Sequence, residues 1–384
     1  NMEITNLSKD KNNLLERIFK LQKHNTDIKT EVMAGITTFM TMAYILVVNP
    51  MILSQAGMDQ GSVFVATALS AAIATFFMGI LANYPIALAP GMGLNVFFAN
   101  TIVLQMGYSW QFALMAVFIE GLIFILLTVT RLREKIIECI PMNLKFAVTA
   151  GVGLFIAFVG LQNASIVVDG ALGNMHDPLV ILTLFGLLVT GALVAKDKKG
   201  ALLISIVVIS VIGMGLGLVA LPQGIMSLNV PSLKPVFLQA FSVDINEIFS
   251  LDMVIAVFTL LFVDLFDTVG CLVGVAEKGN LLDENGNIPR AKEAMLADAI
   301  GTTTGALLGT STVTSFIESA SGIGEGGKTG LTAITTGVLF LLSLFFAPLF
   351  IAIPTQATSA VLIIVGVMMA GSLNKIDFDD FTNA

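Results

Sequence analysis

Long apolar segments recur from residue 32 to residue 371, and they limit what this chain can fold into more than any other feature. A helix that crosses a bilayer needs about 17 to 25 mostly apolar residues. Only 12% of the residues are charged, about half the share typical of soluble domains. We therefore expect an all-α polytopic membrane protein. The twelve candidate spans are 32–49, 64–82, 86–104, 110–130, 142–160, 179–195, 201–219, 250–275, 294–308, 312–323, 330–350 and 355–371.

Charge and cysteine content exclude several other classes of protein. The formal net charge of −8 argues against a basic surface for nucleic acid, so we expect no nucleic-acid partner. Cys139 and Cys271 are too few for a disulfide framework. The sequence offers no cofactor motif, and we expect neither a cofactor nor a bound metal.

Basic residues fall almost entirely on one side of the predicted membrane topology. Eighteen of the 19 Lys and Arg residues lie in the N-terminal tail and in alternate loops, and Lys234 is the exception. Because cytoplasmic loops carry an excess of Lys and Arg, we expect both termini to be cytoplasmic. This distribution predicts a multi-pass protein of the plasma (inner) membrane.

Two of the twelve segments are poor continuous helices. Segment 86–104 is interrupted by a Pro-Gly-Met-Gly sequence at 90–93, and segment 312–323 is short, rich in Ser and Thr, and contains Glu318. Irregular backbone at membrane depth survives only where it is buried in protein or lines a cavity. The two broken segments are the third and the tenth, an offset of seven crossings that inverts the topology of a second repeat. Transporters with inverted repeats place their discontinuous segments in such positions.

Polar side chains at membrane depth are the candidate functional groups, because burying them is costly. No Lys or Arg lies at the same depth in the predicted topology, which leaves three roles open: helix–helix hydrogen bonds, proton exchange, or contacts to a ligand rich in N–H donors. Asp264 and Asp267 are three residues apart, so we expect them on one helical face together with Thr268 and Cys271. The full set is Asn95, Glu120, Asp264, Asp267, Asp298 and Glu318.

Four motifs closely resemble the adenine/guanine/hypoxanthine permease branch of the nucleobase transporters, within the xanthine/uracil permease-like superfamily. The resemblance implies fourteen spans as an inverted 7+7 repeat, with a core domain that holds the substrate and a gate domain against which it moves. It also implies short extended segments in the third and tenth spans that meet at the site, and often a homodimer. The motifs are GITTFMTMAYILVVNP at 35–50, ALAPGMGLNVFF at 87–98, FVDLFDTVG at 262–270 and TSFIESASG at 314–322.

The resemblance also implies domain boundaries. Members of the family continue through two further crossings, so we expect the last two spans to be absent from this chain. The expected parts are a cytoplasmic tail with an interfacial amphipathic helix at 1–29, a core domain at 30–135 and 248–350, and a gate domain at 136–247 and 351–384.

Site residues follow from the same motifs. Asp267 resembles the acidic residue that binds the base, and Glu318 resembles the carboxylate that reads the ring edge. Phe316 matches an aromatic that stacks on the heterocycle, with the amides of Ile317 and Ser319 nearby. Asn95 matches a polar third-span position and is expected to bind substrate, and Asp298 resembles a supporting acidic residue. Apart from the resemblance, Asp264 and Glu120 are carboxylates at membrane depth, and we expect them to form a proton-coupling network with Asp298.

We predict from these residues a secondary active transporter that imports purine nucleobases (hypoxanthine, guanine and adenine) by proton symport with elevator-like alternating access. Where uracil-type relatives have a His, this chain has Cys271, which favours a carboxylate as the proton carrier. The alternatives are an anion or sulfate carrier, or a pyrimidine carrier, of the same general fold. We expect no enzyme activity, because His24 and His176 lie outside the spans and no nucleophile–base pair is present.

Overall fold

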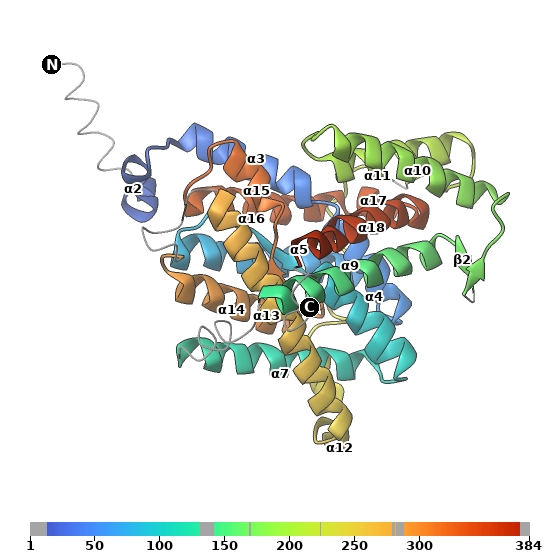
Figure 1. Ribbon diagram of the computed structural model, residues 1–384, viewed down its shortest axis with the longest axis horizontal. Coiled ribbons are helices and arrows are strands. Elements are labelled where there is room, and N and C mark those ends of the chain that lie inside the picture. Colours follow the sequence, from blue (N-terminus) through green and yellow to red (C-terminus); the bar gives the residue numbers. More distant parts are fainter. Residues whose placement is uncertain are drawn as a thin grey trace.

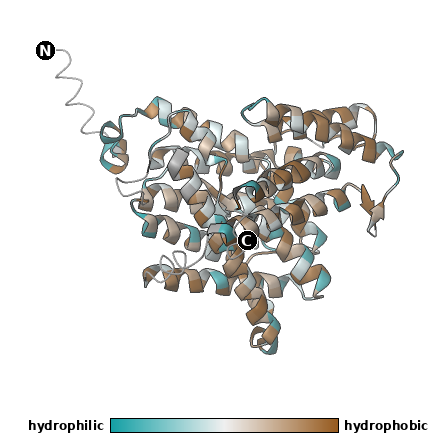
Figure 2. Cartoon of the chain, in the orientation of Figure 1, coloured by the Kyte–Doolittle hydropathy of each residue, from teal (hydrophilic) through white to brown (hydrophobic). Residues whose placement is uncertain are grey.

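The computed structural model describes residues 14–130, 142–168, 170–222, 224–278, 281 and 288–376. In this part of the chain eight helices are long and apolar enough to cross a membrane, and two shorter apolar helices cover Met92–Gln105 and Ala201–Gly215. Hydrophobic residues cover most of α10 and α11 and the outer end of α13 (Figure 2). The chain is therefore a mostly helical, multi-pass membrane protein, as the sequence predicts.

The described part of the first half contains ten helical segments before a small hairpin. The elements are α2 (Leu14–Phe19), η1 (Gln22–His24), α3 (Ile28–Met42), α4 (Ile45–Gln55), α5 (Gln60–Phe77), η2 (Met78–Ala82), β1 (Leu88–Pro90), α6 (Met92–Val96), η3 (Phe97–Gln105), α7 (Trp110–Val129), α9 (Met142–Asn163), β2 (Val167–Val168) and β3 (Ala171–Leu172).

The second half continues with helices on either side of one short strand. The elements are α10 (Pro178–Ala195), α11 (Ala201–Gly215), η4 (Gln239–Ser242), α12 (Ile245–Ile248), α13 (Leu251–Lys278), α14 (Ala291–Leu308), β4 (Val313–Ser315), α15 (Ser319–Gly324), α16 (Gly330–Ser343), η5 (Leu344–Phe346), α17 (Ala347–Ile351), α18 (Thr355–Ala370) and η6 (Gly371–Lys375).

Polar caps mark where several apolar helices begin. The side chains of Asp27, Asp59, Ser109, Asp177 and Thr329 each accept a hydrogen bond from a backbone N–H in the first turn of the following helix. Such caps satisfy amide groups that have no partner within the helix. These caps therefore determine the residue at which each helix begins, which apolar content alone does not specify.

Two expected spans are subdivided. The segment expected at 32–49 consists of α3 and α4, which are separated by Ala43 and Tyr44. The segment expected at 330–350 consists of α16, η5 and α17, and Pro348 lies in the first turn of α17. Proline lacks the N–H that a continuous helix needs there, which accounts for the second interruption.

The helices form two groups, defined here by which helices pack together. The larger helix group contains α3, α4, α5, α7, α13, α14, α15 and α16, and the smaller helix group contains α9, α10, α11 and α18. Figure 1 shows α10 and α11 side by side above α18. In the smaller group α9 and α18 approach closely, because a Cβ on Gly366 would overlap the backbone oxygen of Gly153. Small residues permit such close helix packing in membranes.

The described part of the N-terminal tail packs onto the larger helix group. Phe19 and Leu21 are buried against Leu331, at the start of α16. Asn83 donates a hydrogen bond from Nδ2 to the backbone oxygen of Phe19 (3.1 Å). The tail expected at 1–29, with its amphipathic helix, thus has apolar side chains in contact with α16. Residues 1–13 of this tail lie outside the described residues.

A buried carboxylate organises the loop between α15 and α16. Glu31 of α3 is fully buried and accepts hydrogen bonds from the backbone N–H groups of Lys328 (2.9 Å), Thr329 (3.2 Å) and Thr332 (3.3 Å). The hydroxyl of Thr332 also donates to it (2.6 Å). This single side chain therefore joins the start of the first span to the start of α16.

Candidate functional site

The two broken spans meet in the interior as a two-stranded antiparallel sheet. β1 pairs with β4 in the register Leu88 with Ser315, Ala89 with Thr314 and Pro90 with Val313. The N–H of Gly91 donates to the Thr312 oxygen (2.9 Å), and the N–H of Phe316 donates to the Ala87 oxygen (3.0 Å). Each broken span thus supplies hydrogen bonds that the other lacks, which is what irregular backbone needs at membrane depth.

A glycine at the end of β1 brings an acidic residue close to the sheet. A Cβ on Gly91 would lie 2.7 Å from Cγ2 of Thr314 and 3.6 Å from Oδ2 of Asp267. The absence of a side chain at this position lets α13 place the Asp267 carboxylate beside the point where β1 ends.

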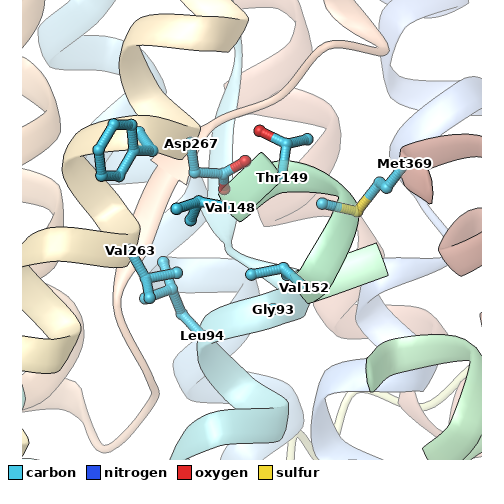
Figure 3. Close-up of a pocket in the computed structure, with 9 residues that line it drawn as sticks. Gly93, Leu94, Val148, Thr149, Val152, Val263, Asp267 and Met369 are labelled. Atoms are coloured by element: carbon cyan, nitrogen blue, oxygen red, sulfur yellow. The ribbon is translucent and has the colours of Figure 1, made fainter. Parts of the chain in front are cut away.

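Asp267 lines a pocket between the two helix groups (Figure 3). Figure 3 shows its carboxylate and the side chain of Thr149 on the same side of this pocket. The larger helix group and the α6 half-helix contribute Gly93, Leu94, Val263, Phe266 and Asp267, and the smaller group contributes Val148, Thr149, Val152 and Met369. The pocket is therefore apolar apart from one carboxylate and one hydroxyl. Its free volume of about 10 Å³ is that of a single water molecule, so a larger ligand requires the two helix groups to move apart.

The pocket also depends on a close approach of α6 to α9. A Cβ on Gly93 would overlap Cγ1 of Val152. The second glycine of the Pro-Gly-Met-Gly break therefore allows the two helix groups to touch beside Asp267.

Glu318 lies at the start of α15 and is held by α3 and the residues that follow it. The hydroxyl of Tyr44 donates to Oε1 of Glu318 (2.7 Å), and the hydroxyl of Thr41 donates to its backbone oxygen (3.4 Å). Glu318 is not among the residues that line the pocket. It is, however, close enough to Asp267 for the two carboxyl groups to interact electrostatically.

Asp264 and Asp298 form a buried network with Thr268. The Thr268 hydroxyl lies 3.2 Å from Oδ1 of Asp264, 3.1 Å from both oxygens of Asp298 and 2.9 Å from the hydroxyl of Thr314. Asp264, Asp267 and Thr268 were expected on one helical face, but their side chains have two different environments. Asp264 and Thr268 face the network with α14 and β4, whereas Asp267 lines the pocket together with Val263, one turn away on α13.

Glu120 contacts the residue that precedes β4. It is fully buried in α7, and its Oε2 accepts a hydrogen bond from the hydroxyl of Thr312 (2.7 Å). Thr312 immediately precedes β4, so this carboxylate supports the break in the tenth span and does not line the pocket.

Asn95 follows the pocket-lining residues Gly93 and Leu94 in the sequence, and its side chain contacts another asparagine. Its Nδ2 donates to Oδ1 of Asn49 (3.1 Å), and Asn49 in turn donates to the hydroxyls of Thr67 and Thr310 (both 2.8 Å). Both asparagines are fully buried. Asn95 therefore links the third span to the first, and only its neighbours Gly93 and Leu94 line the pocket.

The three remaining expected site residues have different environments. Phe316 is buried, whereas the Ile317 side chain is 61% exposed. The N–H of Ser319 donates to the backbone oxygen of Phe316 (3.1 Å), and its hydroxyl accepts from the N–H of Ala87 (3.0 Å). The Ser319 amide is thus used inside the turn that starts α15, and its side chain ties that turn to the third span.

Tyr44, Asn49 and Thr149 are polar residues near the site that were not predicted from the sequence. Tyr44 and Asn49 fall inside the motif at 35–50, and an uncharged polar residue within an apolar run was the signal that could have identified them. Thr149 carries no comparable signal, because only the tertiary packing of α9 brings it to Asp267.

Known proteins resemble this chain in sequence and in fold. Residues 29–384 match the Permease family. The guanine/hypoxanthine permease PbuG of Bacillus subtilis is 47% identical over 381 residues, covering 96% of this chain and 86% of that protein. The adenine permease AdeP of Escherichia coli is 44% identical over 376 residues, covering 97% and 83%. Among solved structures, the transmembrane domain of the cyanobacterial bicarbonate transporter BicA superposes with a TM-score of 0.65 at 16% identity, covering 93% of this chain and 91% of that one.

Proposed function

Because the chain belongs to the Permease family, and within it to the adenine/guanine/hypoxanthine branch, we propose that it is a secondary active transporter that imports hypoxanthine, guanine and adenine by proton symport. The observation that carries this proposal is the position of Asp267, in an apolar pocket lined by both helix groups beside the paired broken spans.

The chemistry of a purine suits this pocket. A purine is planar and presents ring N–H and exocyclic amine donors along its edge, which a carboxylate can accept. We assign this contact to Asp267 and assign the second edge contact to Glu318. Phe316 would cover the face of the ring as an aromatic partner, with the backbone of Ile317 and Ser319 beside it. Asn95 is assigned a contact with the base as well, with its Nδ2 held by Asn49.

The division into two helix groups supports elevator-like alternating access. In this proposal the larger helix group, with β1, α6 and β4, is the core domain, at 30–135 and 248–350. The smaller helix group belongs to the gate domain, at 136–247 and 351–384. Because residues of both groups line the pocket, a displacement of one group relative to the other would open or close it. The inverted 7+7 repeat, a homodimer, an inner-membrane location and cytoplasmic termini complete the proposal.

Proton coupling would use the buried carboxylates. Protonation of Asp267 or Glu318 changes both the charge of the site and the direction of its hydrogen bonds, which links purine affinity to the proton gradient. Asp264, Asp298 and Glu120 would form the supporting network through the hydroxyls that contact them.

Uptake measurements test the proposal. Radiolabelled hypoxanthine, guanine and adenine are offered to cells that lack their own purine importers, with and without a protonophore. Saturable uptake that is lost with the protonophore, and with Asp267→Asn or Glu318→Gln, is the expected result. Asp252→Asn is the matched control, because Asp252 lies at the start of α13, well before Asp267, and contacts Tyr108.

Three outcomes would contradict parts of the proposal. A protein that reaches the membrane but takes up no purine would overturn the substrate, and competition by uracil or sulfate would then test the alternative carriers. Uptake that survives the protonophore would overturn proton symport. Uptake that survives both substitutions would move the site away from Asp267 and Glu318.

A further inference from the structure

Tyr44 occupies the interruption of the first span, directly opposite Glu318. It lies between the end of α3 at Met42 and the start of α4 at Ile45, and its side chain is only 1% exposed. Its hydroxyl donates to Oε1 of Glu318 at 2.7 Å. A buried phenol needs a hydrogen-bond partner, and here that partner is a carboxylate 274 residues away in the sequence.

The packing of α15 on α3 keeps this pair together. A Cβ on Gly322 would overlap the hydroxyl oxygen of Thr38 and would lie 2.5 Å from the backbone oxygen of Ala34. The half-helix that begins after Glu318 is thus seated against α3 through a glycine. Thr41 adds a second contact, from its hydroxyl to the backbone oxygen of Glu318 (3.4 Å). The first span therefore fixes both the backbone and the side chain of Glu318.

We propose that Tyr44 is a positioning residue for purine recognition, because it holds one carboxylate oxygen of Glu318 and so orients the other toward the base. Tyr44 holds Oε1, and no side chain among the described residues is hydrogen-bonded to Oε2 of Glu318, so the proposal assigns Oε2 to an N–H of the ligand. This inference rests on the proposed function, in which Glu318 contacts the edge of the purine.

Tyr44→Phe isolates the contribution of the hydroxyl, since it keeps the ring that fills this buried position. Hydrogen bonds to charged groups are stronger than neutral ones, and without this bond the carboxylate would gain rotational freedom before binding. We expect the KM for hypoxanthine uptake to rise about tenfold, with the maximal rate changed less than about twofold. A purely structural defect would instead lower the amount of folded protein and the maximal rate.

Tyr108→Phe is the matched control variant. Tyr108 also donates its hydroxyl to a carboxylate, that of Asp252, and neither residue lines the pocket. Both variants therefore lose one tyrosine–carboxylate hydrogen bond, and only Tyr44→Phe is expected to change the KM.

A double-mutant cycle tests whether Tyr44 acts through Glu318. Hypoxanthine binding to the purified full chain is measured for the wild type, Tyr44→Phe, Glu318→Gln and the double variant. If the tyrosine acts through the carboxylate, Tyr44→Phe weakens binding in the wild-type background and has no further effect when Glu318 is already Gln. Equal losses in both backgrounds would overturn the inference.

A second measurement needs no destabilising substitution. 3-Fluorotyrosine is incorporated, and the resonances of positions 44 and 108 are followed by fluorine NMR as hypoxanthine is added. We expect the resonance of position 44 to shift and that of position 108 to stay. Wild-type protein that binds hypoxanthine without a shift at position 44 would overturn this inference alone. Wild-type protein that binds no purine at all would overturn it together with the proposed function.

Discussion

Lys199 and Glu325 form an ion pair that joins the two helix groups. Lys199 lies in the loop between α10 and α11, and Glu325 directly follows α15, the half-helix that begins at Ser319. Gly200 packs beside the backbone oxygen of Met40 in α3 at the same place, since a Cβ there would lie 3.4 Å from it. The pair therefore ties a loop of the smaller group to the end of the broken tenth span.

Breaking this ion pair should change the rate of transport more than substrate affinity. Both side chains are partly exposed, and such pairs contribute about 1 kcal/mol or less, equivalent to about fivefold in an equilibrium. We expect Lys199→Gln or Glu325→Gln to change the maximal uptake rate by at most about fivefold, with the KM unchanged. The charge exchange, Lys199→Glu combined with Glu325→Lys, should restore the maximal uptake rate. Lys196→Gln serves as the control. A double variant no better than the singles would contradict a role for the pair.

Gly93→Ala should block the close approach of α6 to α9. The added Cβ would overlap Cγ1 of Val152, a β-branched side chain with little freedom to move aside. We expect purine uptake to fall at least about tenfold, because overpacking of this kind costs about 1–3 kcal/mol. Val152→Ala in the same chain should recover part of the loss. Gly151→Ala is the control, since a Cβ there meets nothing within 4 Å. Unimpaired uptake by Gly93→Ala would show that the helix groups need not touch here.

Glu31→Gln should destabilise the fold without changing the site. The substitution replaces one oxygen that accepts backbone hydrogen bonds with an NH₂ group, so at least one buried N–H of Lys328, Thr329 or Thr332 loses its acceptor. Such a loss costs about 1–3 kcal/mol. Thermal unfolding in detergent should show a lower Tm than wild type, whereas the KM of the folded fraction stays the same. Glu247→Gln, on the exposed surface of α12, should leave the Tm unchanged.

Thr268→Val should show how much the carboxylate network contributes to transport, because Thr268 belongs to this network and does not line the pocket. The change preserves shape and removes the hydroxyl that contacts Asp264, Asp298 and Thr314. We expect uptake to fall about tenfold or more while the protein still elutes as a single folded species, because a buried carboxylate loses a donor. Thr268→Ser keeps the hydroxyl and should retain most of the activity. Similar activities for the Val and Ser variants would exclude a role for this hydroxyl.

The architecture could largely be predicted from the sequence because the bilayer imposes simple rules. Apolar length located the eight long apolar helices of the described residues, whereas the count of twelve spans stays a prediction. The Pro-Gly-Met-Gly and Ser/Thr-rich sequences lie where β1 and β4 pair. The subdivision of the first span at Ala43 and Tyr44 could not be predicted, because no proline or glycine lies there. Fourteen spans, the inverted repeat and the homodimer stay predictions.

The partners of the site residues were harder to predict than the residues themselves. The motif containing Asp267 pointed to a residue that does line the pocket. The structure shows the Asn95 side chain bonded to Asn49 and the Glu318 side chain bonded to Tyr44, two contacts that the sequence did not indicate. The contacts of Asn95 and Glu318 with substrate stay predictions. These contacts join positions tens to hundreds of residues apart, and helical spacing carries information only about neighbours within a turn or two.

The pairing of β1 with β4 also constrains how the protein is made. A ribosome completes residues 88–90 more than 200 residues before it reaches residues 313–315. Until then the extended stretch of the third span has no partner strand for its amide and carbonyl groups, which lipid cannot satisfy. The third span would therefore wait in the insertion machinery, or beside bound water, until the tenth emerges. The pairing thus makes membrane insertion of the first half of the chain depend on synthesis of the second.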